Sequence, residues 1–194
     1  MARYEFRIWG VDLEAVAGHL EELGTPAAIR SSREIYLLVP GFLDTNPKIR
    51  DDTLDVKVLQ RVVDGFEQWE PRLKCTFPVP AAVLESELFP LLGLDPPPLG
   101  LTQYEPSNFV ADVVQPHPKL DAVEVTKARR IYDLGPSIGE AAEVTIAGVR
   151  LTTVAIESED LNSLRAMRDR LGLAARENQS YPRAIRSVLA RTDD

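Results

Sequence analysis

Charged and apolar residues alternate strictly in the first segment of the chain that we predict to be a strand. In residues 3–8, Arg3, Glu5 and Arg7 fall on one face of an extended chain, and apolar residues fall on the other. One interpretation is an antiparallel strand that turns one face to water. The other is a charged face inside a closed barrel, and it requires similar charges on other strands.

Four further segments carry charge with the same alternation. The pairs that share a face are Lys48 and Arg50, Asp55 and Lys57, Lys127 and Arg129, and Glu157 and Glu159. A sheet that helices also cover cannot turn all of these residues to water, so the pattern favours a charged barrel interior. Such an interior suits a polyanionic ligand, because guanidinium and ammonium groups bind phosphate oxygens and carboxylates hold a bridging divalent cation.

Changes of periodicity place the other elements. We expect helices over 11–24, 81–94, 160–173 and 179–191, the second of which is helical only until Pro90. Asp12 and Asp160 are the expected N-caps of the first and third. Strands are expected over 33–41, 47–52, 53–60, 66–80, 121–134, 140–148 and 150–159, with a proline-rich loop at 95–100. The predicted fold class is α+β: a mostly antiparallel β-barrel of about eight strands with covering helices. Closing the sheet removes its edges.

Composition limits the class of protein. The 194 residues are 44% apolar, and we expect a single domain over 1–194. No apolar run approaches the roughly 18 residues of a membrane span, so no membrane partner is expected. The start lacks a signal-peptide pattern and the single Cys75 has no partner for an internal disulfide, so we expect a cytoplasmic protein. A formal charge of −8 argues against nucleic acid as a partner. The oligomeric state is left open.

The order of these segments resembles the CYTH family, also called triphosphate tunnel metalloenzymes. The matching stretches are "RYEFR", "EIYLLVPG", "PKIRDD", "LDVKVL", "VTKARR", "VAIESED" and "QSYPRAI", and they follow the family's order over nearly the whole chain. The resemblance implies a tunnel through a β-barrel that takes a triphosphate or another polyanionic phosphorylated ligand.

The resemblance also implies roles for individual residues. Glu5 and Glu157 match carboxylates of the metal side, which would hold Mg²⁺ or Mn²⁺ weakly. The cations implied to bind phosphate are Arg7, Lys48, Arg50, Lys57, Lys127, Arg129 and, from the closing helix, Arg183.

The chain departs from the family pattern at four positions. Arg3 and Ala155 stand where the family has glutamates, Ala147 where an aspartate is usual, and Ser180 where the closing helix has a lysine. These changes predict that the cationic wall is retained and that a second metal, which would activate water, is hard to hold.

Other chemistries have little support in the sequence. His19 and His117 are far apart, Cys75 has apolar neighbours, and no glycine-rich phosphate loop or nucleophile elbow occurs. Three interpretations stay open. The first is binding of a polyanion with weak or no hydrolysis, which the altered positions favour by a small margin. The second is an active metal-dependent triphosphatase for tripolyphosphate or a nucleoside triphosphate, and the third is a structural or interaction protein with a relic tunnel.

Overall fold

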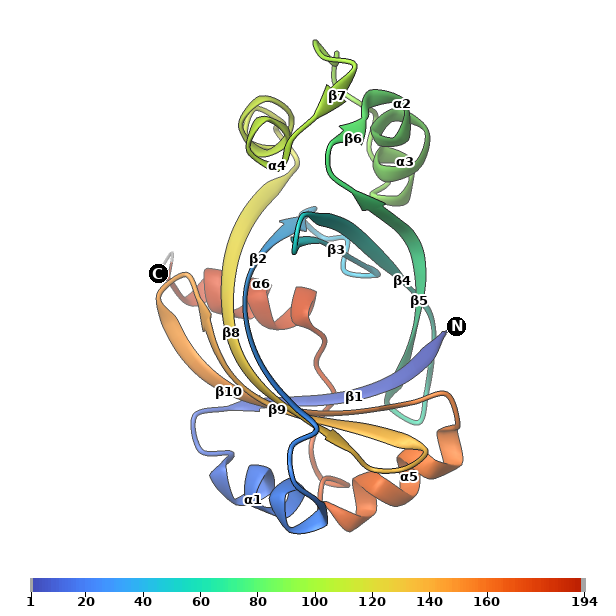
Figure 1. Ribbon diagram of the computed structural model, residues 1–194, viewed down its shortest axis with the longest axis vertical. Helices are drawn as coiled ribbons and strands as arrows, with labels where there is room; N and C mark the ends of the chain where they lie inside the picture. The colour runs from blue at the N-terminus through green and yellow to red at the C-terminus, as the bar shows by residue number, and fades with distance from the viewer. Residues whose placement is uncertain (1, 193–194) are drawn as a thin grey trace. The chain divides into compact units, whose positions relative to one another are not determined.

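The strands of the chain form a closed antiparallel barrel, as the sequence predicts. The computed structural model describes residues 2–192, and its barrel strands follow the order β1-β10-β9-β8-β2-β3-β4-β5 (Figure 1). Their bounds are β1 Arg3–Gly10, β2 Ala28–Leu38, β3 Thr45–Arg50, β4 Thr53–Val63, β5 Phe66–Thr76, β8 Asp121–Asp133, β9 Ser137–Ile146 and β10 Val149–Ser158. No helix within residues 2–192 is both long enough and apolar enough to cross a membrane.

The chain divides into two compact units. Unit 1 comprises Met1–Ser32, Leu59–Glu70 and Val125–Asp194, and unit 2 comprises Arg33–Val58 and Pro71–Glu124. The strands β2, β4, β5 and β8 contribute residues to both units. A single domain over 1–194 stays a prediction, and residues 1, 193 and 194 of that range lie outside the described residues.

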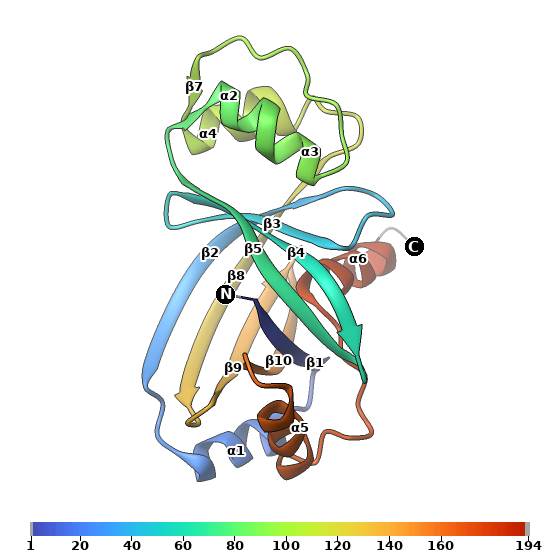
Figure 2. The same cartoon turned by 90° about the vertical axis from the view of Figure 1, so that its right-hand side faces the viewer.

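In unit 1, helices cover one face of the sheet. The helices α1 (Glu14–Leu23) and α5 (Leu161–Arg170) lie against the same side of β1, β9 and β10 (Figures 1 and 2). The apolar side chains of β1, including Phe6 and Ile8, point to this side and pack with Leu13, Leu20 and Leu164. The alternation in the first segment therefore has its apolar face in the core of unit 1, which leaves Glu5 and Arg7 for the other face.

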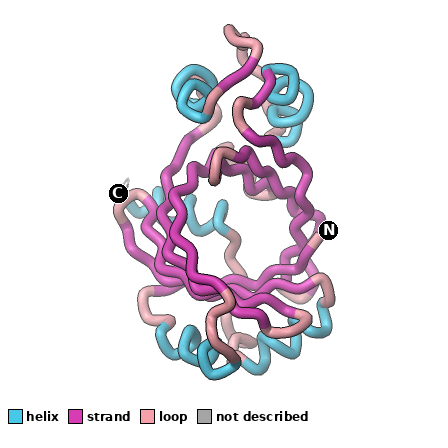
Figure 3. The backbone as a smooth tube through the Cα atoms, viewed as in Figure 1, coloured by secondary structure: helices cyan, strands magenta, loops and turns pink. Residues whose placement is uncertain are grey.

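In unit 2, a second core forms around short helical segments. These segments are α2 (Ala81–Val83), η1 (Leu84–Leu88), α3 (Phe89–Leu91), α4 (Pro106–Asn108) and η2 (Phe109–Val114), with the two-stranded sheet of β6 (Val79–Pro80) and β7 (Gln103–Tyr104). Phe89 and Phe109 are completely buried there with Leu54 and Val56 of β4. Figure 3 separates these helices from the strands by colour.

Several predicted boundaries were wrong. β2 begins at Ala28, five residues before the predicted start. The prediction missed these residues because the polar stretch "RSS" within them lacks an apolar alternation. The segment η2 and the strand β7 were not predicted, and the strand predicted over 66–80 is divided into β5 and β6. Asp12 is not the cap of α1, since the N-cap position is Leu13 and no side chain caps that helix.

Other local predictions are confirmed. Asp160 caps α5 by accepting hydrogen bonds from the backbone N–H groups of Asn162 and Ser163. The last helix, α6 (Tyr181–Thr192), begins next to Pro182, as expected for a proline in a first turn.

The completely buried Leu20 provides a test of the unit 1 core. We expect Leu20→Ala to lower the free energy of unfolding by about 2–5 kcal/mol, because it leaves a cavity between α1 and the sheet. Val11, whose surface is 73% exposed, provides the control. Val11→Ala should change the free energy of unfolding by less than about 0.5 kcal/mol. Denaturant titration measures both values. Equal effects of the two variants would contradict the packing described here.

Candidate functional site

One face of the unit 1 sheet collects the charged residues, and we call it the charged face. Strand pairing defines it: Arg7 lies opposite Ala155 of β10, which lies opposite Glu140 of β9, and Arg129 of β8 lies opposite Ala142. Directly paired residues share a face, and alternate residues of one strand do so too. The charged residues assigned to this face by pairing are Arg3, Glu5, Arg7, Glu67, Lys127, Arg129, Glu140 and Glu157.

Arg7 is the most deeply held cation of the charged face. Its side chain is 4% exposed, and its Nε donates to Glu5 at 2.8 Å. Its Nη1 donates to Glu140 at 2.9 Å and to the Thr153 hydroxyl at 3.3 Å. Burial by itself would lower the pKa of Arg7, but Glu5 and Glu140 outweigh it and raise the pKa well above its usual value. Its role as a phosphate ligand stays a prediction, and such a ligand would share Arg7 with two carboxylates.

Glu140 is the carboxylate that the sequence analysis missed. Its second oxygen lies 3.8 Å from Arg129 Nη1, so its two oxygens face two different arginines. Burial by itself would raise the pKa of Glu140, but Arg7, Lys127 and Arg129 together lower it. A signal was present in the sequence, because Glu140 follows the inward alternation of "SIGEAAEVTI", but its partners are distant in sequence.

Alanines make the contacts of Glu140 possible. β1 and β9 are not neighbours, since β10 lies between them, and the guanidinium of Arg7 reaches Glu140 across Ala155. Ala155 is 1% exposed and Ala142, opposite Arg129, is 3% exposed. A glutamate at position 155, as the family pattern has it, would stand in the path of the Arg7–Glu140 pair. Glu140, opposite Ala155 on the next strand, therefore supplies a carboxylate close to the position where the family pattern has one.

The aromatic ring of Tyr181 covers two of these cations. Lys127 Nζ lies 3.6 Å from the ring centroid and Arg7 Cζ lies 4.7 Å from it, both within cation–π range. Trp9 packs edge-on against the same ring, with 4.8 Å between the centroids. The start of α6 thus lies against the charged face, at Arg7 and Lys127.

The segment before α6 fixes this position by pairing with β1. β1 pairs with β5 only over Arg3–Glu5. Beyond that point the backbone N–H of Arg7 donates to the Asn178 side chain at 2.7 Å, and the backbone N–H of Gln179 donates to the Arg7 carbonyl at 2.8 Å. The Trp9 indole also donates to the Gln179 carbonyl at 2.8 Å. Residues 178–179 therefore form hydrogen bonds with the backbone of β1 beyond the point where β5 stops pairing with it.

Three glutamates lie in one row across β5, β1 and β10. Glu5 is directly opposite both Glu67 and Glu157. Each of them faces an arginine: Glu5 faces Arg7 at 2.8 Å, Glu157 faces Arg3 at 4.0 Å, and Glu67 faces Arg183 at 3.5 Å. Among the described residues, no group of three or more acidic, histidine or cysteine side chains is arranged to hold a metal ion. In this arrangement the carboxylates fit arginine partners rather than a divalent cation, and the metal site stays a prediction.

Arg183 of α6 faces Glu67 of the charged face, and its role as a phosphate ligand stays a prediction. Its side chain is 44% exposed and lines a pocket of about 440 Å³ with Phe6, Asp64, Arg168 and Arg176.

Unit 2 has a charged cluster of its own. Glu34 of β2 is completely buried, and its carboxylate lies 3.3 Å from Lys48 Nζ and 3.7 Å from Arg50 Nη1. The Tyr36 hydroxyl donates to the same carboxylate at 3.2 Å. Lys48 lies opposite Asp55, so Lys48 and Lys57 share a face of the β3–β4 hairpin, and their role as phosphate ligands stays a prediction. Burial lowers the pKa of Lys48. Glu34 opposes this effect, and the nearby cations Arg50 and Lys57 add to it.

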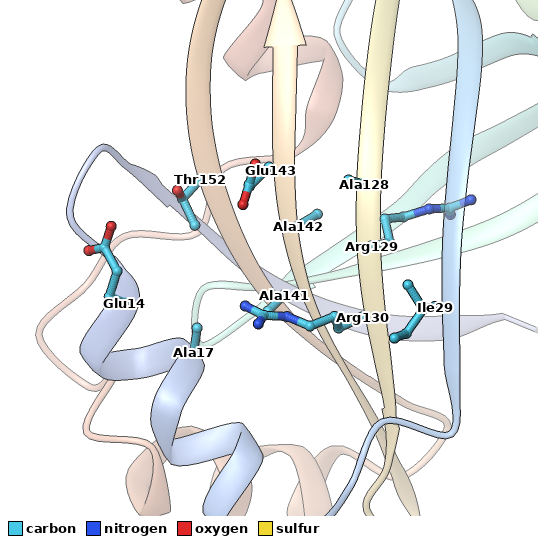
Figure 4. A pocket seen from close by; sticks show the side chains of 10 residues that line it. All are labelled: Glu14, Ala17, Ile29, Ala128, Arg129, Arg130, Ala141, Ala142, Glu143 and Thr152. Atoms are coloured by element: carbon cyan, nitrogen blue, oxygen red, sulfur yellow. The ribbon is translucent and has the colours of Figure 1, made fainter.

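Neighbouring residues of β8 show how strand register assigns each charge to a face. In Figure 4, the side chains of Arg129 and Arg130 leave β8 in opposite directions, and Arg130 points toward α1. Arg130 pairs with Glu21 of α1 at 2.8 Å and is 46% exposed, whereas the Arg129 side chain is 12% exposed. Arg130 also lines a pocket of about 230 Å³ with Glu14, Ile29 and Glu143.

One expected acidic position was wrong. Ala147 lies in the turn between β9 and β10, with a positive φ of 47°, and is exposed. It is therefore not on the strand that lines the charged face. Ser180 is buried just before α6.

Comparisons with known proteins show the fold. No family model matches the chain, and no curated protein sequence matches it significantly. A candidate adenylate cyclase from Bacillus halodurans is 11% identical with a TM-score of 0.53, over 93% of this chain and 96% of that chain. HpAC1 from Hippeastrum, a candidate adenylyl cyclase described as having a dominant triphosphatase activity, is 11% identical with a TM-score of 0.56, over 97% and 96%.

A third structure, of a conserved hypothetical protein from Pyrococcus furiosus, is 16% identical with a TM-score of 0.56 over 93% of this chain and 98% of that chain. Together with the closed eight-stranded barrel, these likenesses confirm a CYTH-like fold.

The lowered pKa of Glu140 predicts an acid-dependent loss of stability. A carboxylate with a depressed folded-state pKa stabilises the fold above its unfolded pKa of about 4.3, and this stabilisation is lost as pH falls through the folded-state pKa. Glu140→Gln should lower the free energy of unfolding at pH 7 by about 1–3 kcal/mol. The difference between wild type and variant should shrink between pH 5 and pH 3. Urea titrations at each pH measure it, and a constant difference would contradict the assigned ionisation.

Proposed function

We propose that the protein binds a triphosphate or a similar polyanionic phosphorylated ligand at the charged face, with weak or no hydrolysis. The observation that carries the proposal is the placement of Arg7, Lys127 and Arg129 on one face of a CYTH-like barrel sheet, where Arg7 and Arg129 both face Glu140. Lys127 is 5% exposed and Arg7 is 3% exposed. Burying a cation costs desolvation energy, and a bound polyanion would add to the compensation that the carboxylates of this face already provide.

The cluster of unit 2 supports the same kind of ligand. The pKa of Lys48 is lowered, which means that burial and the neighbouring cations disfavour its ammonium form more than Glu34, 3.3 Å away, favours it. An anion close to Lys48 would raise this pKa and favour the ammonium form. We therefore include Lys48, Arg50 and Lys57 among the proposed phosphate-binding residues.

Weak hydrolysis follows from the partners of the carboxylates. Phosphoryl transfer depends on metal ions and cationic groups that neutralise charge on the attacking and leaving oxygens. Here Arg3 lies 4.0 Å from Glu157 and 3.7 Å from Glu159, and Arg7 holds Glu5. Mg²⁺ or Mn²⁺ would have to compete with these arginines for the same oxygens.

A metal-dependent triphosphatase is the second candidate function. The row of Glu67, Glu5 and Glu157 on adjacent strands favours it, because three carboxylates on one face are available to a metal if their arginines turn away. The triphosphatase activity described for HpAC1, which has the same fold, also favours it.

Two adjacent arginines of β8 provide a matched test of binding. We expect millimolar tripolyphosphate at low salt to raise the melting temperature of the wild type, since a ligand that binds only the folded state stabilises it by mass action. Arg129→Gln should lose most of this shift, because Arg129 is on the charged face. Arg130→Gln, on the opposite face against α1, should keep it. No shift for the wild type, or equal losses in both variants, would contradict the proposed site.

Hydrolysis provides a separate test. We expect the wild type to turn over tripolyphosphate and ATP more slowly than about 1 s⁻¹ with Mg²⁺ or Mn²⁺, below the usual enzyme range. Arg3→Glu should increase metal-dependent phosphate release, because it places a carboxylate beside Glu157 and removes a competing cation. The same change at the exposed Arg30 should have no effect. A faster wild-type turnover would support the triphosphatase instead.

A further inference from the structure

We infer that Glu140 is a resident anion of the cation cluster on the charged face, and that its displacement makes the site selective for polyphosphates over singly phosphorylated anions. This inference rests on the proposed function and names the residue that sets the substrate class. Glu140 occupies the position between Arg7 and Arg129 that an oxygen of a bound anion would take.

The geometry of Glu140 is that of a bound oxyanion. One carboxylate oxygen accepts from Arg7 Nη1 at 2.9 Å, and the other lies 3.8 Å from Arg129 Nη1. Lys127, on the same strand and face as Arg129, is close enough to act on its charge. Charge-assisted contacts from two guanidinium groups are the usual way in which proteins hold a carboxylate or a phosphate. The side chain is 16% exposed, so these contacts are screened little by solvent.

Two small residues give Glu140 room for its contacts. The Arg7–Glu140 contact spans the intervening strand β10 above the small side chain of Ala155. Ala142 gives similar room opposite Arg129. With these alanines, shortening Glu140 leaves a space bordered by cations, which is the chemical environment of an anion site.

An incoming anion meets both the attraction of the cations and the repulsion of Glu140. Since the cations keep Glu140 ionised, an anion with little charge gains little from replacing it. Tripolyphosphate carries more charge and more acceptor oxygens than orthophosphate, so it can contact other cations while it displaces the carboxylate. Selectivity for polyphosphates is the expected consequence.

The binding experiment compares tripolyphosphate and orthophosphate by calorimetry, with a chelator present so that no divalent metal takes part. Glu140→Gln should bind tripolyphosphate at least about tenfold more tightly than the wild type, which corresponds to about 1.4 kcal/mol. Its gain for orthophosphate should be larger, so the selectivity ratio should fall. Glu143→Gln is the matched control, because Glu143 is exposed, on the same strand and on the opposite face.

The outcomes separate the two proposals. If the wild type binds tripolyphosphate and Glu140→Gln binds it equally or more weakly, the resident-anion inference is wrong and the proposed function remains. If only Glu140→Gln binds, no polyphosphate displaces Glu140 from the wild type, so the proposed function and the inferred selectivity are both contradicted. If Glu143→Gln reproduces the gain, the effect is one of overall charge and the inference is wrong.

A rescue experiment tests the inference without any polyphosphate. Glu140→Ala should melt several degrees below the wild type, and formate, which has the carboxylate of the missing side chain, should restore a large part of this loss at constant ionic strength. Formate should shift the wild type and Glu143→Ala much less. Equal shifts of all three proteins would overturn the inference, and this readout requires only that Glu140→Ala folds at low temperature.

Discussion

A guanidinium that is removed from water requires negative partners, and the charged face of unit 1 is organised around this requirement at Arg7. Its side chain contacts Glu5 of its own strand, Thr153 of β10 and Glu140 of β9. These contacts tie three strands together on the face opposite the apolar core. Removing one partner of such a group leaves a buried charge uncompensated, so the cations and carboxylates of this face must be understood as one set.

Unit 2 has the same arrangement with different residues. A completely buried glutamate, Glu34, serves Lys48 and Arg50 and accepts from the Tyr36 hydroxyl. The balance is less complete there, because the pKa of Lys48 remains lowered. In unit 1, the carboxylates outweigh the effect of burial on Arg7. Burial therefore dominates the pKa at Lys48, whereas the carboxylates dominate it at Arg7.

The departures from the family pattern take on a different meaning in three dimensions. Ala155 appears in the sequence as a lost acid, but the Arg7–Glu140 pair passes above it, and a longer side chain would block that contact. Arg3 stands beside Glu157 and Glu159 as a permanent cation where the pattern has a glutamate. The proposed binding of an anion without metal-activated water agrees with this arrangement, because the arginines already contact the carboxylates that a metal would need.

The sequence by itself determined the α+β barrel class, the alternation of faces along each strand and the cap of α5. Alternation with period two is a covalent property of an extended chain, so "YEFRI" separates Arg7 from Phe6 and "KARR" separates Arg129 from Arg130 in any sheet. Asp160 was predictable for the same reason, since its partners are two and three residues away.

Only the tertiary structure decided which charges meet. Strand register fixes which residues lie opposite one another, and a shift by two residues keeps every face but changes every partner. Arg7 and Glu140 are 133 residues apart in the chain and on strands that are not neighbours. Neither that pair nor the burial of Glu34 is encoded in a local pattern, because each depends on how distant strands are aligned.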